Sequence, residues 1–149
     1  MSSMKELVQN RKGHFDFQIS ETHEAGVVLL GTEIKSLRNN GGSLQEAYVK
    51  IIRGELWLIG AHIAPYSHGN VYNHEERRDR KLLMHKYEIE KLENATREKG
   101  MTLVPLALYL KNGRIKLKFG IGKGKKHQDK RQTLVEREKK REMDRAMKR

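Results

Sequence analysis

Lysine side chains in the last quarter of the chain have the spacing of a phosphate-binding surface. Lys116 and Lys118 alternate with apolar residues, so they are expected side by side on the outer face of a strand. Lys123, Lys125 and Lys126 follow closely and are interpreted as further contacts to a nucleic-acid backbone. Lys116 and Lys118 also fit solvated strand-face lysines, but the tyrosine and histidine rings elsewhere in the chain favour backbone contacts beside stacking platforms.

Two residues outside this lysine group also suit RNA binding. Glu24, which stands just before Gly26, is either a plain turn residue or a carboxylate that accepts hydrogen bonds from base amino groups. Leu82, Leu83 and Met84 are consecutive apolar residues that cannot all face a core. At least one of the three is therefore available to a base or a protein partner.

Motifs for catalysis or metal binding have little support in this sequence. The glycines at 120, 122 and 124 precede a lysine, but their spacing is not that of a P-loop, and they are interpreted as a flexible exit from the last strand. The 7 histidines are scattered and form no HExxH motif, which favours ordinary surface histidines. We therefore predict no catalytic residue, no metal site and no cofactor.

The charge balance points to a polyanionic partner. The chain has 31 Lys+Arg against 19 Asp+Glu, a formal net charge of +12, and residues 123–149 alone hold 12 basic and 5 acidic residues. There is no cysteine, so disulfides and thiolate chemistry are excluded. The first residues lack a signal-peptide pattern and no apolar run would span a bilayer, so a soluble cytoplasmic protein with no membrane contact is expected.

The elements that must position these residues are mostly short strands. Period-2 alternation predicts a strand through Phe15, Phe17 and Ile19, then a turn over 20–26 and a strand over 27–30. A helix is expected over 31–38, capped by Thr32. Further along, the patterns predict a hairpin of 48–52 and 55–59, whose second strand continues through 61–63 to Pro65, and then a polar surface loop over 66–81. A helix over 85–99 and a hairpin of 104–110 and 115–121 follow.

Hairpins, short antiparallel strands and few helices favour a small barrel. The expected fold class is mainly β with a few helices, an OB-fold-like antiparallel barrel, with a β-sandwich as the competing architecture. The domain organisation expected is a barrel over 1–122 and a basic C-terminal tail over 123–149. The tail has strong helix formers and favourable i,i+4 charge pairs but no continuous apolar stripe, so it is predicted to be disordered when free and helical on a phosphate-lined surface.

Ordered blocks of residues along nearly the whole chain resemble the small protein B family, whose members bind transfer-messenger RNA (SsrA RNA) in bacterial trans-translation. The blocks are 24–26 (EAG), 31–38 (GTEIKSLR), 62–66 (HIAPY), 80–83 (RKLL), 103–106 (LVPL), 109–113 (YLKNG), 123–126 (KGKK) and 129–131 (DKR). The resemblance implies an OB-fold barrel that binds the tRNA-like part of transfer-messenger RNA and brings it to stalled ribosomes in ribosome rescue. It implies no catalysis.

The resemblance also implies roles for particular residues. Family RNA-binding positions fall here on Glu24, Leu83 and Lys116. The tail would enter the decoding site and the empty mRNA channel of the ribosome as a helix. Its contact residues would be His127, Gln128, Asp129, Lys130 and Arg131, with either His127 or Gln128 placed to stack on ribosomal RNA.

Two other classes of protein also fit parts of the sequence. An RNA-processing enzyme would use His/Glu pairs around the loop 66–78, and cleavage of structured RNA that depends on His68 or His74 would reveal it. A structural ribosomal protein would have a similar size and basic tail, but would stay on ribosomes at one copy each. We expect instead an adaptor, acting as a monomer.

Overall fold

The structure is organised around one long hairpin. β8 (Met101–Lys111) and β9 (Arg114–Gly124) pair antiparallel along their whole length. Their turn has φ of 51° at Asn112 and 79° at Gly113, which is the left-handed geometry that a two-residue Asn-Gly turn provides. β4 (Tyr48–Ile52) and β5 (Glu55–Ile59) form a second hairpin of the same kind, with φ of 52° at Arg53 and 76° at Gly54. Both predicted hairpins are confirmed.

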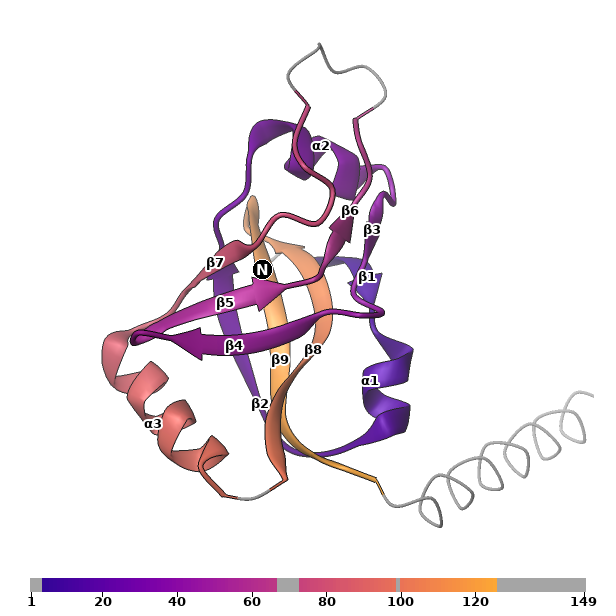
Figure 1. Cartoon of the computed structure of the whole chain (residues 1–149). Coiled ribbons are helices and arrows are strands. Elements are labelled where there is room, and N and C mark those ends of the chain that lie inside the picture. The colour runs from indigo at the N-terminus through magenta and orange to yellow at the C-terminus, as the bar shows by residue number, and fades with distance from the viewer. Residues whose placement is uncertain (1–3, 67–72, 99, 126–149) are drawn as a thin grey trace, which may run out of the picture.

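The computed structural model of the chain describes residues 4–66, 73–98 and 100–125. The predicted tail from residue 126 onward therefore lies outside the described residues. The remaining elements of the described part, shown in Figure 1, are β1 (Met4–Gln9), α1 (Arg11–Asp16), β2 (Phe17–Val27), α2 (Gly31–Arg38), β3 (Gly42–Ser43), β6 (His62–Ile63), β7 (Arg80–Leu83) and α3 (Lys86–Thr96). Among these described residues no helix is long and apolar enough to cross a membrane.

The main sheet curls into a nearly closed ring. Its strand order is β1-β8-β4-β5-β7-β2-β9, all pairs are antiparallel, and β9 returns to pair with β8. Strand pairing in the ring is shortest between β4 and β8, where the register contains a single pair, Val49 and Leu103. Over the described residues, a ring of strands with three helices confirms the mainly β barrel class over the sandwich.

β2 differs most from what the sequence predicted. The strand runs unbroken through residues 20–26, which were expected to form a turn, with one register shift between Ile19 and Glu21. Most of its side chains are exposed or half-buried, so its polar residues resemble those of a loop. The strand begins only at Phe17, because Phe15 belongs to α1, whose N-cap Asn10 accepts a hydrogen bond from the Gly13 N–H at 3.2 Å.

The helix over 31–38 is confirmed as α2, but two local expectations about it are wrong. The preceding strand ends at Val27, not at residue 30, and the N-cap is Leu30, not Thr32. Glu33 takes the capping role, since its Oε1 accepts from the Leu30 N–H at 2.8 Å. Thr32 instead hydrogen-bonds through Oγ1 to Nδ1 of His74, at 2.9 Å.

Helices lie at the two ends of the ring (Figure 1). α2 and the small β3–β6 ribbon lie at one end, and α3 lies at the other. α3 confirms the helix predicted over 85–99 and places Ile89 and Leu92 in the hydrophobic core. The barrel interior is otherwise filled by inward-facing strand residues, among which Leu56, Leu58, Leu117 and Phe119 are almost fully buried.

The glycines at 120 and 122 serve packing within β9, so their interpretation as a flexible exit is wrong. A Cβ added to Gly120 would lie 2.6 Å from Cγ2 of Ile19, and one added to Gly122 would lie 2.9 Å from Cδ1 of the same residue. Both glycines let β2 approach β9 closely. β9 extends to Gly124, and the Lys125 N–H then donates to the Asp16 carbonyl at 2.9 Å.

Candidate nucleic-acid interface

Three strands place Leu83, Gly26 and Lys116 in one line on the outside of the barrel. Gly26 of β2 is the register partner of Leu83 on β7 and of Lys116 on β9. A Cβ added to Gly26 would lie 3.4 Å from Cβ of Leu83 and 3.8 Å from Nζ of Lys116, so the lysine ammonium lies over the glycine. Leu83 is 55% exposed, high for a leucine. We call these three residues the cross-strand row.

Glu24 lies beside the row and is held in place by two neighbours. It is the register partner of Lys118, and its Oε2 accepts hydrogen bonds from the Tyr109 hydroxyl and, at 3.4 Å, from Nζ of Lys111. The Tyr109 bond, with Lys111 and Lys116, holds the pKa of the Glu24 carboxyl below its usual range. Both bonds end on Oε2, so Oε1 can accept from a ligand.

Tyr109 is a mostly buried anchor for this carboxylate. Burial, together with the adjacent Glu24 charge, raises the pKa of its hydroxyl above the ordinary tyrosine value. The hydroxyl therefore stays protonated and keeps donating to Glu24 over the whole physiological range. A fixed acceptor on a barrel face suits recognition of an exocyclic base amino group.

Shallow cavities flank the cross-strand row on both sides. One of about 440 Å³ is lined by Glu24, Gly26, Leu83, Met84, His85, Glu88 and Lys116. Another of about 380 Å³ is lined by the same row together with Val27, Leu29, Ile34, Gly113, Arg114 and Ile115. An apolar side chain, an ammonium group and an oriented carboxylate thus meet at one place, which can contact a base or ribose, a phosphate and a base edge respectively.

Other sequence-predicted residues lie elsewhere or outside the described part of the chain. Lys118 is exposed and belongs with the row through its pairing with Glu24. Lys123 lies at the far end of β9, about 23 Å along the strand from Lys116 at about 3.3 Å per residue, and Lys125 follows it beside α1. The structure does not describe the last predicted lysine and the five ribosome-contact positions: Lys126, His127, Gln128, Asp129, Lys130 and Arg131.

The residues that sequence reasoning missed are Tyr109 and Lys111. The Asn112-Gly113 turn fixes the register of the last hairpin and pairs Tyr109 with Lys116. Counting outward from that turn would therefore have placed the tyrosine next to a predicted RNA-binding lysine. The Tyr109 hydroxyl meets Glu24 because β2 pairs with β9, and no local pattern in the sequence predicts that pairing.

A buried ionic cluster fixes β7, the strand that ends in Leu83. Arg80 and Glu33 both have fully buried side chains, and Nε of Arg80 donates to Oε2 of Glu33 at 2.6 Å. Arg78 donates to Oε1 of the same carboxylate at 2.6 Å, and Arg80 also donates to the Ala61 carbonyl at 2.8 Å. Burial opposes ionisation of Glu33, but the hydrogen bonds from Arg78, Leu30 and Arg80 outweigh it and lower its pKa.

His74, a candidate for RNA cleavage, has a structural position. Its side chain is buried, with Nε2 2.8 Å from the Ile63 carbonyl and Nδ1 2.9 Å from Oγ1 of Thr32. Since a carbonyl only accepts, Nε2 donates to it, and Nδ1 is hydrogen-bonded to the threonine hydroxyl. Both ring nitrogens are therefore occupied. His68 lies outside the described residues, which contain no cluster of three or more metal-binding side chains.

A basic β-barrel that presents an apolar side chain, an ammonium group and an oriented carboxylate on one face is a nucleic-acid-binding protein of the barrel class. The chain belongs to the SmpB protein family, whose sequence profile matches residues 7–149. This is a family of non-enzymatic RNA-binding proteins.

Individual relatives are similar over almost their full length. An "SsrA-binding protein" of Protochlamydia amoebophila is 60% identical over 143 residues, covering 96% of this chain and 94% of the relative. The "SsrA-binding protein" of Chlamydia caviae is 57% identical and covers 99% and 98%. A solved structure described as "tmRNA-SmpB: a journey to the center of the bacterial ribosome" matches with a TM-score of 0.68 and 42% identity, covering 80% of this chain and 84% of that one.

Proposed function

We propose that this chain is an SsrA-binding protein of trans-translation. It binds the tRNA-like part of transfer-messenger RNA and brings that RNA to stalled ribosomes, acting as an adaptor and not as an enzyme. The name shared by relatives that match nearly the whole chain supports this proposal. The excess of basic residues supports it as well, since phosphate contacts supply much of the affinity of such proteins.

The observation that carries the RNA-binding part is the cross-strand row together with Glu24 beside it. Leu83 offers an exposed apolar surface, Lys116 places its ammonium over Gly26, and Glu24 keeps one carboxylate oxygen for a donor. These groups fit a folded RNA whose bases and backbone turn together, because they combine one phosphate contact with one base-edge contact and one apolar contact. Lys118 adds a second positive charge beside Glu24.

Binding of the tRNA-like fragment of SsrA RNA to variants of the row tests this proposal. Lys116→Gln should weaken binding roughly tenfold or more, since a hydrogen bond to a charged group contributes about 1.5–3 kcal/mol, and should lower the salt slope by about 0.7–0.9. Leu83→Glu, at an exposed site, should weaken binding while leaving the fold intact. Lys5→Gln, an exposed lysine on β1, is the matched control. Unchanged affinity and salt slope in both row variants would contradict the proposal.

The ribosome-directed part of the function is assigned to the end of β9, from Lys123, and to the chain that follows it. Lys123, Lys125 and Lys126 contact RNA backbone, and the tail from residue 127 probes the decoding site and the empty mRNA channel. Its contact residues are His127, Gln128, Asp129, Lys130 and Arg131. The concentration of basic charge in residues 123–149 supports this assignment. Bacterial ribosomes translate in the cytoplasm, so the protein acts there.

A further inference from the structure

The chain has one tryptophan, and it lies on the outer barrel face, on a strand next to β7 of the cross-strand row. Trp57 of β5 is the register partner of Lys50 on β4 and of Lys81 on β7. The inward residues of these strands are buried, whereas Lys50 is exposed and Trp57 and Lys81 are half-buried. An indole ring is thus flanked on both neighbouring strands by a lysine. We call these three residues the tryptophan platform.

From this placement we propose that the tryptophan platform is a second contact surface for SsrA RNA. An unpaired base stacks on Trp57, while Lys50 and Lys81 contact the flanking phosphates. The inference rests on the proposed function, and it adds a surface that neither the cross-strand row nor the basic tail includes. Stacking of bases on an aromatic side chain between cationic groups is the common chemistry of RNA recognition on barrel faces.

Exposed apolar side chains continue the platform along β4. Tyr48 is 48% exposed and Ile52 is 40% exposed, and both lie on the same side of β4 as Lys50. Ile59 of β5 pairs with Tyr48. Such a group of apolar side chains beside lysines, on the outside of a barrel whose interior is well filled, is the composition expected of a binding surface.

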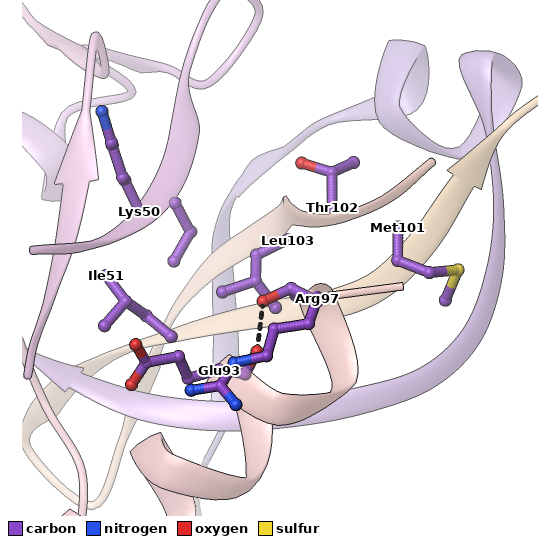
Figure 2. Close-up of a pocket in the computed structure, with 9 residues that line it drawn as sticks. Lys50, Ile51, Glu93, Arg97, Met101, Thr102 and Leu103 are labelled. Carbon is purple, nitrogen blue, oxygen red and sulfur yellow. Dashed lines mark hydrogen bonds between the residues drawn. The ribbon is translucent and has the colours of Figure 1, made fainter. Parts of the chain in front are cut away.

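The lysines of the platform are free to reach a ligand. Figure 2 shows Lys50 extending from β4 away from Glu93 and Arg97, whereas Ile51 points toward them, as strand alternation requires. Lys81 pairs with Glu55 at 3.5 Å, but both side chains are about half exposed. An exposed pair of this kind is weak, so a phosphate can replace the glutamate.

Continuity along β7 identifies the occupant as the same RNA. Lys81 belongs to the platform and Leu83 to the cross-strand row, and both lie on the outer side of this one strand, two residues apart. The sheet between them has no break, since β5, β7 and β2 are consecutive neighbours. An RNA docked on Leu83 therefore reaches Lys81 and Trp57 by following the barrel surface. The lysines complement its phosphates and would not favour a basic protein.

Trp57 itself reports on the contact, since RNA contains no tryptophan. The full chain is titrated with the tRNA-like fragment of SsrA RNA, and binding is followed in parallel by mobility shift. We expect tryptophan emission to be quenched and protected from acrylamide, with the same midpoint as the mobility shift.

In a second arm, Trp57→Leu should bind roughly five- to hundredfold more weakly, and Lys50→Gln with Lys81→Gln should lower the salt slope by about 0.8 per lysine. Lys5→Gln is the control for both effects.

The outcomes separate this inference from the proposed function. Unchanged emission and acrylamide quenching at saturating RNA would overturn the inference while leaving the proposed function in place. No mobility shift at all would refute the proposed function, and this inference with it. If Trp57→Leu binds SsrA RNA with full affinity but binds small ribosomal subunits more weakly, the occupant is ribosomal RNA and the inference is wrong. The wild-type titration needs no variant, so misfolding cannot mask the answer.

Discussion

A single carboxylate illustrates how the fold prepares a side chain for RNA. Glu24 stands on an exposed strand, yet Tyr109 and Lys111 hold its Oε2 and leave Oε1 to a ligand. The Tyr109 bond is the largest cause of the lowered pKa of Glu24. A carboxylate with a depressed pKa keeps its charge, and so its capacity to accept, to lower pH than an ordinary glutamate.

At this scale we predict that Tyr109→Phe raises the pKa of Glu24 toward the ordinary glutamate value of 4.5. The variant loses the hydroxyl donor while keeping the ring in place, so the ionised form is stabilised less. NMR titration of the Glu24 carboxyl carbon in both proteins measures the change. Lys5→Gln, which removes an exposed charge but neither of the two bonds described for Glu24, should change the pKa far less. A pKa that is equal in wild type and Tyr109→Phe would show that the tyrosine does not tune this carboxylate.

Glu24→Gln tests what the charge does for RNA. The amide is nearly the same size but keeps only one acceptor oxygen, which the Tyr109 hydroxyl will compete for. We expect several-fold weaker binding of SsrA RNA at pH 7, with the salt slope unchanged because no phosphate contact is lost. Filter binding at three salt concentrations gives both quantities. Affinity equal to wild type would assign Glu24 a purely structural role.

Among the elements, β7 depends most on the network around it. This short strand begins in a fully buried arginine and ends in an exposed leucine, and the Glu33/Arg78/Arg80 cluster ties it to α2. Removing one partner of a buried ion pair leaves the other charge unpaired and is strongly destabilising. The cluster thus fixes where Leu83 emerges from the barrel.

We predict that Glu33→Gln lowers the free energy of unfolding by about 3–5 kcal/mol at pH 7. Because the pKa of Glu33 is depressed in the folded protein, its contribution is present above the unfolded-state pKa and is lost as the pH falls through the folded value. Urea unfolding of both proteins at pH 7 and at successively lower pH below 4.5 should therefore show the difference shrinking. Lys81→Gln, whose lysine makes only an exposed pair, should cost far less. A difference that is constant with pH would contradict the assigned ionisation.

Local sequence patterns predicted the elements that depend on interactions between residues close in sequence. The Asn112-Gly113 and Arg53-Gly54 turns predicted the two hairpins, and the helical spacing of Ile89 and Leu92 predicted α3. β2 was mistaken for a turn because its pairing partners, β7 and β9, lie far away in sequence and its exposed side chains follow no apolar alternation. Gly120 was misread for the same reason, since the close approach of Ile19 that requires it is non-local.

The candidate site also has one part that local patterns predict and another part that depends on long-range strand pairing. The run of Leu82, Leu83 and Met84 could be recognised as holding at least one apolar side chain surplus to the core, and Lys116 could be recognised from its strand alternation. Their assembly with Glu24 depends on the register of three strands, which only the structure provides. Resemblance to a family could point to these residues, but not to the Tyr109 bond that orients Glu24.

At the scale of the whole molecule, β9 connects the two regions to which we assign RNA binding and ribosome binding. Lys116 near its start belongs to the proposed RNA-binding face, and Lys123 near its end precedes the basic C-terminal residues. Gly120 and Gly122 keep this strand tightly packed on β2, so these two glycines belong to a paired strand that continues to Gly124. We expect the barrel to hold SsrA RNA and the tail to act on the ribosome, with little energetic overlap between the two.

Deletion of residues 132–149 tests this division most directly, with affinity for the tRNA-like fragment of SsrA RNA and peptide tagging on stalled ribosomes measured on the same protein. Our account predicts affinity within about twofold of the full chain, because the barrel residues remain, and loss of tagging, because the tail is gone. Lys116→Gln should show the opposite pattern, with its affinity for SsrA RNA falling before peptide tagging does. A large loss of SsrA RNA affinity on deletion, or normal tagging without the tail, would contradict it.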